Sequence, residues 1–144
     1  GDAFAFDEAQ TSLFALDWKQ TTGGLISTGS ARSSKVGAGA DTSISLSTPS
    51  GGDDVRLPTI IVPEASDVFL RITASCTADQ LMYVYWKPKD ALGFKIAWRV
   101  QIPLTSTVRS STLQISVPAG PLDVMLRTQS TAILREFELR AAPR

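Results

Sequence analysis

The amino-acid sequence predicts an all-β domain, a β-sandwich or barrel of about 8–10 antiparallel strands. Strand-sized apolar runs recur along the chain, and clusters of Gly, Pro, Asp and Ser separate them. Several of these runs alternate apolar with polar residues, which is the period of a half-buried strand. No helical periodicity extends beyond two turns. No repeat of fixed period is visible, which argues against a propeller or a solenoid.

The first third of the chain contains short strand-like runs and one long polar stretch. An apolar run at residues 13–18 precedes a glycine turn at 23–24. Residues 27–41 are rich in Ser, Gly and Ala, and predict a mobile surface loop. A flexible linker is the alternative, but too little chain precedes this stretch to form a separate domain. Residues 44–46 then alternate with serines in a short strand that ends at a turn over 48–54.

Two further strands are predicted before the middle of the chain. The run 55–62 contains Pro58, which has no N–H to donate to a ladder and so predicts an edge position or a bulge. The run 68–76 alternates cleanly. Its apolar face consists of Val68, Leu70, Ile72 and Ala74. Cys76 continues that face and no base is identifiable near it, which predicts a buried, inert thiol.

Residues 80–103 predict an aromatic-rich hairpin that organises the rest of the sandwich. The run 94–102 alternates, which predicts one long strand with Trp98 in the core. The run 81–86 does not alternate, so either face presents large apolar side chains, and the face left outside is a candidate binding surface. The sequence does not reveal which face is buried. The two opposing sets are Leu81, Tyr83 and Tyr85 against Met82, Val84 and Trp86.

The last third of the chain predicts three more strands, at about residues 113–117, 122–126 and 133–139. Facing positions of these strands and of the earlier ones define one predicted core. Its members are Leu70, Ile72, Trp98, Leu113, Ile115, Val117 and Phe137.

Length and composition predict one globular domain over residues 1–144, with 43% hydrophobic residues and no net charge. This balance argues against disorder and against nucleic-acid binding. No apolar run approaches the length of about 20 residues that a membrane span needs. Gly1 is predicted to be a remnant of cloning. The residues after it suggest the start of a mature chain, and with the Ser/Thr/Gly-rich surface they favour an exported bacterial protein, periplasmic or secreted.

The residue types present exclude several kinds of catalysis. We predict that the protein is not an enzyme and that it has no catalytic residue. The chain has no histidine, which excludes triads with a histidine base and imidazole metal sites. No phosphate-binding loop or nucleophile elbow occurs. The closest acid pairs are Asp53 with Asp54, in a turn where solvated acids are common, and Glu136 with Glu138, on a strand face expected to be exposed. A glycosidase nevertheless needs only two carboxylates brought together in space.

We expect no cofactor and no metal. A structural calcium ion is the alternative, since calcium takes six to eight oxygen ligands. Acidic turns at Asp41, Asp53, Asp54 and Asp67 would supply some of them.

The aromatic residues of the central hairpin predict a carbohydrate platform. Aromatic rings stack on the apolar C–H faces of sugars, and neighbouring Arg, Lys and Gln side chains donate hydrogen bonds to hydroxyl groups. The alternative is that the same rings complete the sandwich core. The candidate ligand-binding residues are Tyr83, Tyr85, Trp86, Arg71, Lys95 and Arg99.

Three stretches resemble the galactose-binding-like jelly-roll modules, especially uncharacterised bacterial ones found alone or attached to glycan-handling proteins. They are DDVRLPTIIVPEASDVFLRI, MYVYWKPKDALGFKIAWRVQIPL and VPAGPLDVMLRTQSTAILREFEL, and together they cover about residues 53–140. Residues 4–18 are a weaker match to the opening strand. The resemblance implies a jelly-roll β-sandwich and a noncatalytic domain, often carbohydrate-binding. It carries no ligand residue across, because these vary in the loops of the family.

Two classes of function therefore stay open. The first is a noncatalytic carbohydrate-binding module of an exported bacterial protein, with an oligo- or polysaccharide as its partner. The second is a structural or interaction domain that meets a protein partner or a second copy of itself. The mixture of Met82, Val84 and Trp86 is typical of interface cores and favours the second class. The resemblance favours the first.

Overall fold

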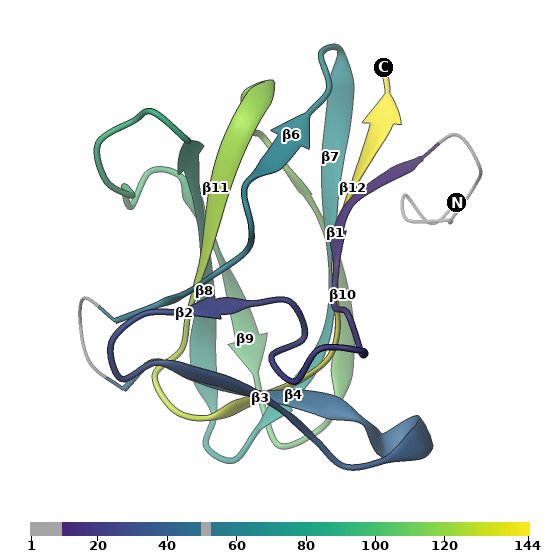
Figure 1. The fold of residues 1–144 in the computed structure, drawn as a ribbon, viewed down its shortest axis with the longest axis vertical. Coiled ribbons are helices and arrows are strands. Elements are labelled where there is room, and N and C mark those ends of the chain that lie inside the picture. The colour runs from purple at the N-terminus through teal and green to yellow at the C-terminus, as the bar shows by residue number, and fades with distance from the viewer. Residues whose placement is uncertain (1–9, 50–52) are drawn as a thin grey trace.

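Two antiparallel sheets face each other across an apolar core in the computed structural model, which describes residues 10–49 and 53–144. In Figure 1 the sheets stand on the left and right, with the core between them. The predictions for Gly1 and residues 4–9 lie outside the described residues, as does the middle of the turn predicted at 48–54. Within the described ranges, no helix has the length and apolarity that a membrane-spanning helix needs.

The first sheet, sheet A, has β12 at its centre. Along one edge β12 pairs with β7 over its full length, and along the other edge with β4 and then β1. The strand order is β10-β7-β12-β4-β3, with β1 beside β12. The strands are β1 (Thr11–Ala15), β3 (Arg32–Val36), β4 (Ser43–Ser47), β7 (Ser66–Cys76), β10 (Arg109–Ile115) and β12 (Ala132–Pro143).

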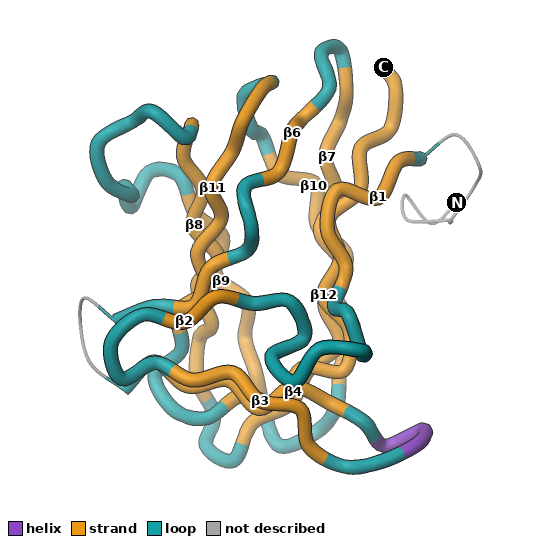
Figure 2. Tube along the Cα trace, viewed as in Figure 1, coloured by secondary structure: helices purple, strands orange, loops and turns teal. Residues whose placement is uncertain are grey.

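The second sheet, sheet B, repeats this plan around β11, which pairs with β8 on one edge and with β6 and then β5 on the other. The strand order is β2-β5-β11-β8-β9, with β6 beside β11. The strands are β2 (Ile26–Ser27), β5 (Val55–Arg56), β6 (Ile60–Val62), β8 (Gln80–Pro88), β9 (Arg99–Leu104) and β11 (Gly120–Arg127). Figure 2 shows the one helical turn of the described residues, η1 (Gly39–Asp41), at the edge of the molecule.

Alternation along β7 builds the centre of the core, as predicted. The inward side chains are all buried, and the outward ones between them are half-buried. Cys76 ends this face as a free, buried cysteine, as its position in the pattern predicts. The buried set is Val68, Leu70, Ile72, Ala74 and Cys76.

Strand β8 turns Met82, Val84 and Trp86 into the core and sends Tyr83 and Tyr85 to the outer face of sheet B. Trp86 is only 6% exposed. The burial of these side chains settles which face of the 81–86 run is inside.

The strand predicted over 94–102 begins only at Arg99, and the placement of Trp98 in the core is wrong. Trp98 is 38% exposed, while Val100 and Ile102 do face inward. The last bond from β8 toward β9 runs from the Trp86 N–H to the Trp98 carbonyl (3.2 Å). The next residue of β8 that would donate on that side is Pro88. Its nitrogen carries no hydrogen, so the ladder cannot continue.

The polar segment 27–41, predicted to be a mobile loop, contains strand β3. This strand pairs with β4 from Arg32 opposite Ser47 to Val36 opposite Ser43. It lies at the edge of sheet A, where most of its side chains face solvent. Small polar residues suit such an edge strand as well as they suit a loop, so composition alone did not separate the two.

Two further predictions from the sequence can be compared with the structure. Pro58 lies exposed in the break between β5 and β6, so the ladder is interrupted there, while the Leu57 N–H still bonds to Val124 of β11 (3.0 Å).

Of the predicted core, Trp98 alone is exposed. Leu70, Ile72, Ile115 and Phe137 are buried, and Leu113 and Val117 pack against them half-buried.

The two tryptophans of the hairpin should differ in their effect on stability. We expect Trp86→Ala to cost about 3–5 kcal/mol, because it opens a cavity in the core. Trp98→Ala should cost about 1 kcal/mol or less, as is usual for exposed positions. Urea denaturation followed by far-ultraviolet circular dichroism measures both variants. Equal losses would contradict the exposed position of Trp98.

Candidate ligand-binding site on the outer face of sheet B

The outer face of sheet B brings three of the predicted site residues together. Tyr83 and Tyr85 project from β8, and their rings lie 6.2 Å apart. Arg99 is the β9 residue opposite Tyr85. On the other side of β8, strand β11 places Arg127 opposite Tyr83 and Met125 opposite Tyr85. The face is therefore aromatic along its centre and carries a guanidinium group on each side.

Arg99 holds the two tyrosine rings. Its guanidinium carbon lies 4.6 Å from the centroid of Tyr83 and 5.6 Å from that of Tyr85. Its Nη1 donates a hydrogen bond to the Tyr85 hydroxyl oxygen (2.9 Å). Cation–π contacts of this kind stabilise by about 0.5–2 kcal/mol, depending on desolvation. Tyr85 is only 9% exposed and forms the floor of the site.

The connection between β8 and β9, residues 89–98, folds over this face through Phe94. The ring of Phe94 meets that of Tyr85 edge to face, with centroids 6.4 Å apart. Two cations lie against the same ring, Arg56 at 5.0 Å and Lys87 at 5.4 Å. Phe94 thus anchors the connection onto the sheet.

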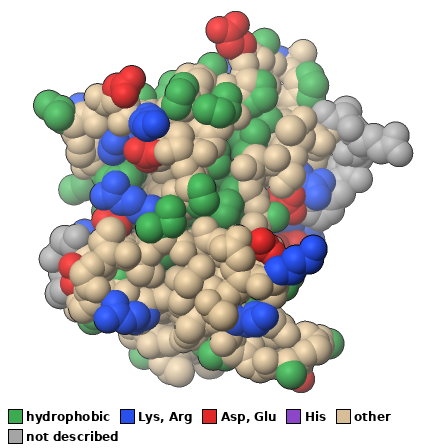
Figure 3. Space-filling view, viewed as in Figure 1, with side chains coloured by type: hydrophobic (Ala, Val, Ile, Leu, Met, Phe, Trp, Pro, Cys, Tyr) green, Lys and Arg blue, Asp and Glu red, His purple; other side chains and the backbone are tan. Residues whose placement is uncertain are grey.

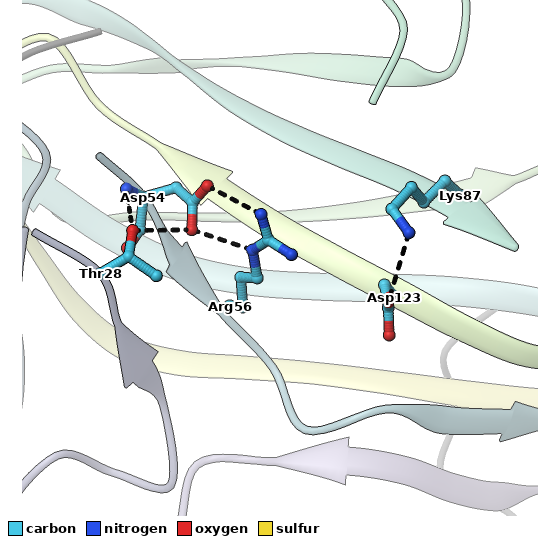
Figure 4. A network of polar contacts seen from close by, with 5 residues as sticks. All are labelled: Thr28, Asp54, Arg56, Lys87 and Asp123. Carbon is cyan, nitrogen blue, oxygen red and sulfur yellow. Dashed lines mark hydrogen bonds and ion pairs between the residues drawn. The ribbon is translucent and has the colours of Figure 1, made fainter. Parts of the chain in front are cut away.

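Each of these cations is held by a carboxylate of the sheet. Arg56 forms two contacts with Asp54, of 3.0 and 3.3 Å. Lys87 pairs with Asp123 (3.3 Å). Figure 4 shows Arg56 lying between the Asp54 group and the Lys87–Asp123 pair. Thr28 also donates to Asp54 (3.3 Å). Asp54 is buried, so the expectation of a solvated acid in a turn is wrong for this residue.

A cavity of about 460 Å³ lies between the connection and the sheet. Its wall combines aromatic and aliphatic surface with one acid and one base. The lining residues are Asp54, Tyr85, Phe94, Ile96, Met125 and Arg127. Small-molecule sites combine apolar surface with a few fixed polar groups, and this hollow offers both.

Arg127 is the one charged lining residue that has no partner among the described residues. Its Nε atom is buried there without a hydrogen bond, and no ion pair joins it to a carboxylate. Asp54, across the cavity wall, is already paired with Arg56. The cavity therefore presents a free guanidinium group.

The other three predicted site residues lie elsewhere. Trp86 is in the core, on the inner side of sheet B. Arg71 lies on sheet A, where it pairs with Glu136 (3.1 Å). Lys95 is exposed on the connection, with its amine 5.6 Å from the centroid of the Trp98 ring. None of these three lines the cavity.

Sequence reasoning missed Arg127 and Met125, although a signal for them was present. In the run GPLDVMLR, Leu122, Val124 and Leu126 alternate with Asp123, Met125 and Arg127. That alternation puts the second set on the outer face. No sequence pattern indicated Phe94 or Arg56, because the contact between them depends on how the β8–β9 connection folds back over the sheet.

Three of the four acids paired in the sequence analysis form ion pairs, Asp54 with Arg56 and the two glutamates as follows, while Asp53 accepts a hydrogen bond from the Ser30 N–H (3.1 Å). Glu136 bonds to Arg71, and Glu138 to Arg140 (2.9 Å). Asp67 contacts Arg144 (3.1 Å). In the part of the chain that the structure describes, no three Cys, Asp or Glu side chains gather into a metal-binding group.

The sandwich is similar to those of solved carbohydrate-binding modules. The CBM22-1–GH10 modules of the Clostridium thermocellum xylanase 10B, solved with xylohexaose, match with a TM-score of 0.64 at 7% identity, over 90% of this chain and 28% of that one. A CBM4 structure matches with 0.55 at 14% identity, over 79% and 78% of the two chains. The CBM6cm-2 module of the Cellvibrio mixtus lichenase 5A, solved with cellotriose, matches with 0.54 at 8% identity, over 90% and 97%.

No protein-family model and no curated protein matches this chain. At the identities of the solved structures, the likeness establishes the fold: the chain is a jelly-roll β-sandwich, as the sequence predicts. The described residues form twelve strands rather than about 8–10, because several, such as β2 and β5, are only two residues long.

Removing the Phe94 ring should loosen the connection without unfolding the sandwich. Its edge-to-face and two cation–π contacts together are worth about 2 kcal/mol. In Phe94→Ala, we expect amides in residues 89–98 to exchange hydrogen about tenfold faster or more, while β7 and β12 keep their protection. Leu92→Ala, at a side chain that is 96% exposed, is the control and should change nothing. Unchanged exchange in Phe94→Ala would show that Phe94 is not the anchor.

Proposed function

We propose that the chain is a noncatalytic carbohydrate-binding domain and that the sugar binds in the cavity under the β8–β9 connection. The observation that carries this proposal is the composition of the cavity wall. Tyr85 and Phe94 supply aromatic surface, while Asp54 and Arg127 supply a hydrogen-bond acceptor and a donor. A sugar ring needs both kinds of contact, because its C–H faces are apolar and its edge carries hydroxyl groups.

The positions of the carboxylates support a noncatalytic role. Glycosidases of the usual kind use two carboxyl groups that flank the bond they cleave. Among the described residues, Asp54 is the one carboxylate in the cavity wall, and Arg56 holds it through two contacts. The nearby Asp123 is paired with Lys87 and also accepts a hydrogen bond from Thr59 (2.8 Å). Both acids are therefore engaged with partners of their own.

The comparisons support the same class. Two of the similar solved structures contain bound oligosaccharides, xylohexaose in one and cellotriose in the other. A polysaccharide ligand would place this domain outside the cytoplasm, as part of an exported bacterial protein. The periplasm and the extracellular medium both fit this role.

Exposed apolar side chains around the same site favour a second candidate, a protein-interaction surface. On the connection, Leu92 is 96% and Ile96 72% exposed. Ile26 and Ile61, on β2 and β6 of the same sheet, are also exposed. Figure 3 shows hydrophobic side chains gathered over β6 and β11 on this side of the molecule. Apolar residues exposed together on a surface are typical of interaction sites.

Binding measurements on a panel of neutral and acidic polysaccharides test the proposal. We expect the wild-type protein to bind at least one of them, and Phe94→Leu to weaken binding about tenfold or more, because a leucine side chain lacks the π face. Trp18→Ala, at an exposed tryptophan outside the cavity, is the matched control and should bind normally.

The same experiment separates the two candidates when it is combined with light scattering. A monomer that binds sugar, and whose affinity is unchanged in Leu92→Asp, supports the carbohydrate site. A stable dimer that ignores every polysaccharide and dissociates in Leu92→Asp would replace it with the interaction surface.

A further inference from the structure

We propose that the sugar bound at this site is acidic, and that the guanidinium group of Arg127 binds its carboxylate. This inference rests on the proposed carbohydrate site, and it names the class of sugar. It starts from Arg127, the charged residue of the cavity that the fold leaves without a partner.

The missing partner of Arg127 is unusual for a donor in its position. Nearly all buried polar atoms in proteins have a hydrogen-bond partner, and an unsatisfied donor destabilises the structure that holds it. Arg127 is half-buried, and its Nε is buried without an acceptor in the described part of the chain. No hydrogen bond joins the Nη atoms to another described residue either. An acceptor that entered the cavity would therefore be the first partner of this guanidinium group, and it would bind at the Nη atoms because Nε is enclosed.

The charge balance around the cavity leads to the same conclusion. Arg56 and Lys87 are each neutralised by a carboxylate of the sheet, at 3.0 and 3.3 Å. Arg99 bonds to the hydroxyl group of Tyr85, and no ion pair joins it to a carboxylate among the described residues. Of the four bases that the strands of sheet B place on this face, Arg99 and Arg127 therefore stay without a counter-charge among the described residues. Two uncompensated cations beside one hollow attract an anionic ligand.

The arrangement also favours a carboxylate on a sugar over a free anion. The cavity wall next to Arg127 is Met125 and Tyr85, with Phe94 and Ile96 above them. A small inorganic anion would leave this apolar surface uncovered, whereas a sugar ring covers it with its C–H face. A carboxylate at the edge of that ring would bind the guanidinium group of Arg127. The planar guanidinium group can donate two parallel hydrogen bonds to the two oxygens of a carboxylate.

Arg127 itself has no structural role in the described residues that would explain its position. Its neighbours on the outer face, Tyr83 and Tyr85, are both held by Arg99 rather than by Arg127. Replacing Arg127 should therefore leave the sandwich intact, and this makes it a clean site for a test.

The test compares polygalacturonate with its fully methyl-esterified form, which keeps the sugar and removes the charge. We expect the wild-type protein to bind the acid form at least tenfold more tightly than the ester. In Arg127→Gln this preference should disappear, because the affinity for the acid form falls to that for the ester, while the melting temperature stays the same. Arg127→Lys should keep part of the preference, because it retains the charge and loses the fork. Arg109→Gln, on β10 of sheet A, is the control.

Each other outcome overturns the inference in a recognisable way. Equal binding of both forms, or a preference that survives in Arg127→Gln, would contradict the binding of a sugar carboxylate by Arg127. Neither result would contradict the carbohydrate site itself. Binding of a sulfated polysaccharide with no binding of polygalacturonate assigns the site to sulfate esters instead. Failure to bind any neutral or acidic polysaccharide removes the proposed function and the inference with it.

Discussion

Strand β8 carries large side chains on both of its faces, and the architecture of sheet B follows from the need to cover both. Inside, Met82, Val84 and Trp86 pack into the core. Outside, Tyr83 and Tyr85 would leave an aromatic stripe open to water if nothing covered it. Burial of such rings is among the larger favourable terms available to a small domain. The chain covers part of the stripe with its own β8–β9 connection, and Arg99 holds both rings from the neighbouring strand.

The connection is held by charge as well as by apolar contact, and a hollow remains beneath it. Phe94 rests on two cations, Arg56 and Lys87, and each is fixed by a carboxylate at hydrogen-bonding distance. The space left beside the Phe94 ring, between Met125 and Ile96, is the cavity. A rigid sheet with an anchored connection is a suitable frame for binding, because little order is lost when a ligand enters.

Much of the fold could be predicted from alternation, and the failures occur where alternation stops being informative. The inward faces of β7 and of the second half of the hairpin follow directly from the period of two. Trp98 continues that period in the sequence, yet the ladder ends at its carbonyl group because Pro88 cannot donate the next bond. Of the six candidate site residues, Tyr83, Tyr85 and Arg99 share one face. Arg71 has the same outward direction but belongs to the other sheet, and pattern alone does not assign strands to sheets.

The sequence by itself determined the class of fold, the strand faces and the chemistry that the chain lacks. These are local properties, since alternation, turn residues and residue types can be read without knowing which segments meet. Only the tertiary structure decided which face of β8 is buried and that Asp54 is paired with Arg56 rather than solvated. It also decided that Arg127 lines a cavity and has no partner within residues 10–49 and 53–144. Each of these depends on segments that are distant in the chain, and their contacts are set by strand order and by the path of the β8–β9 connection.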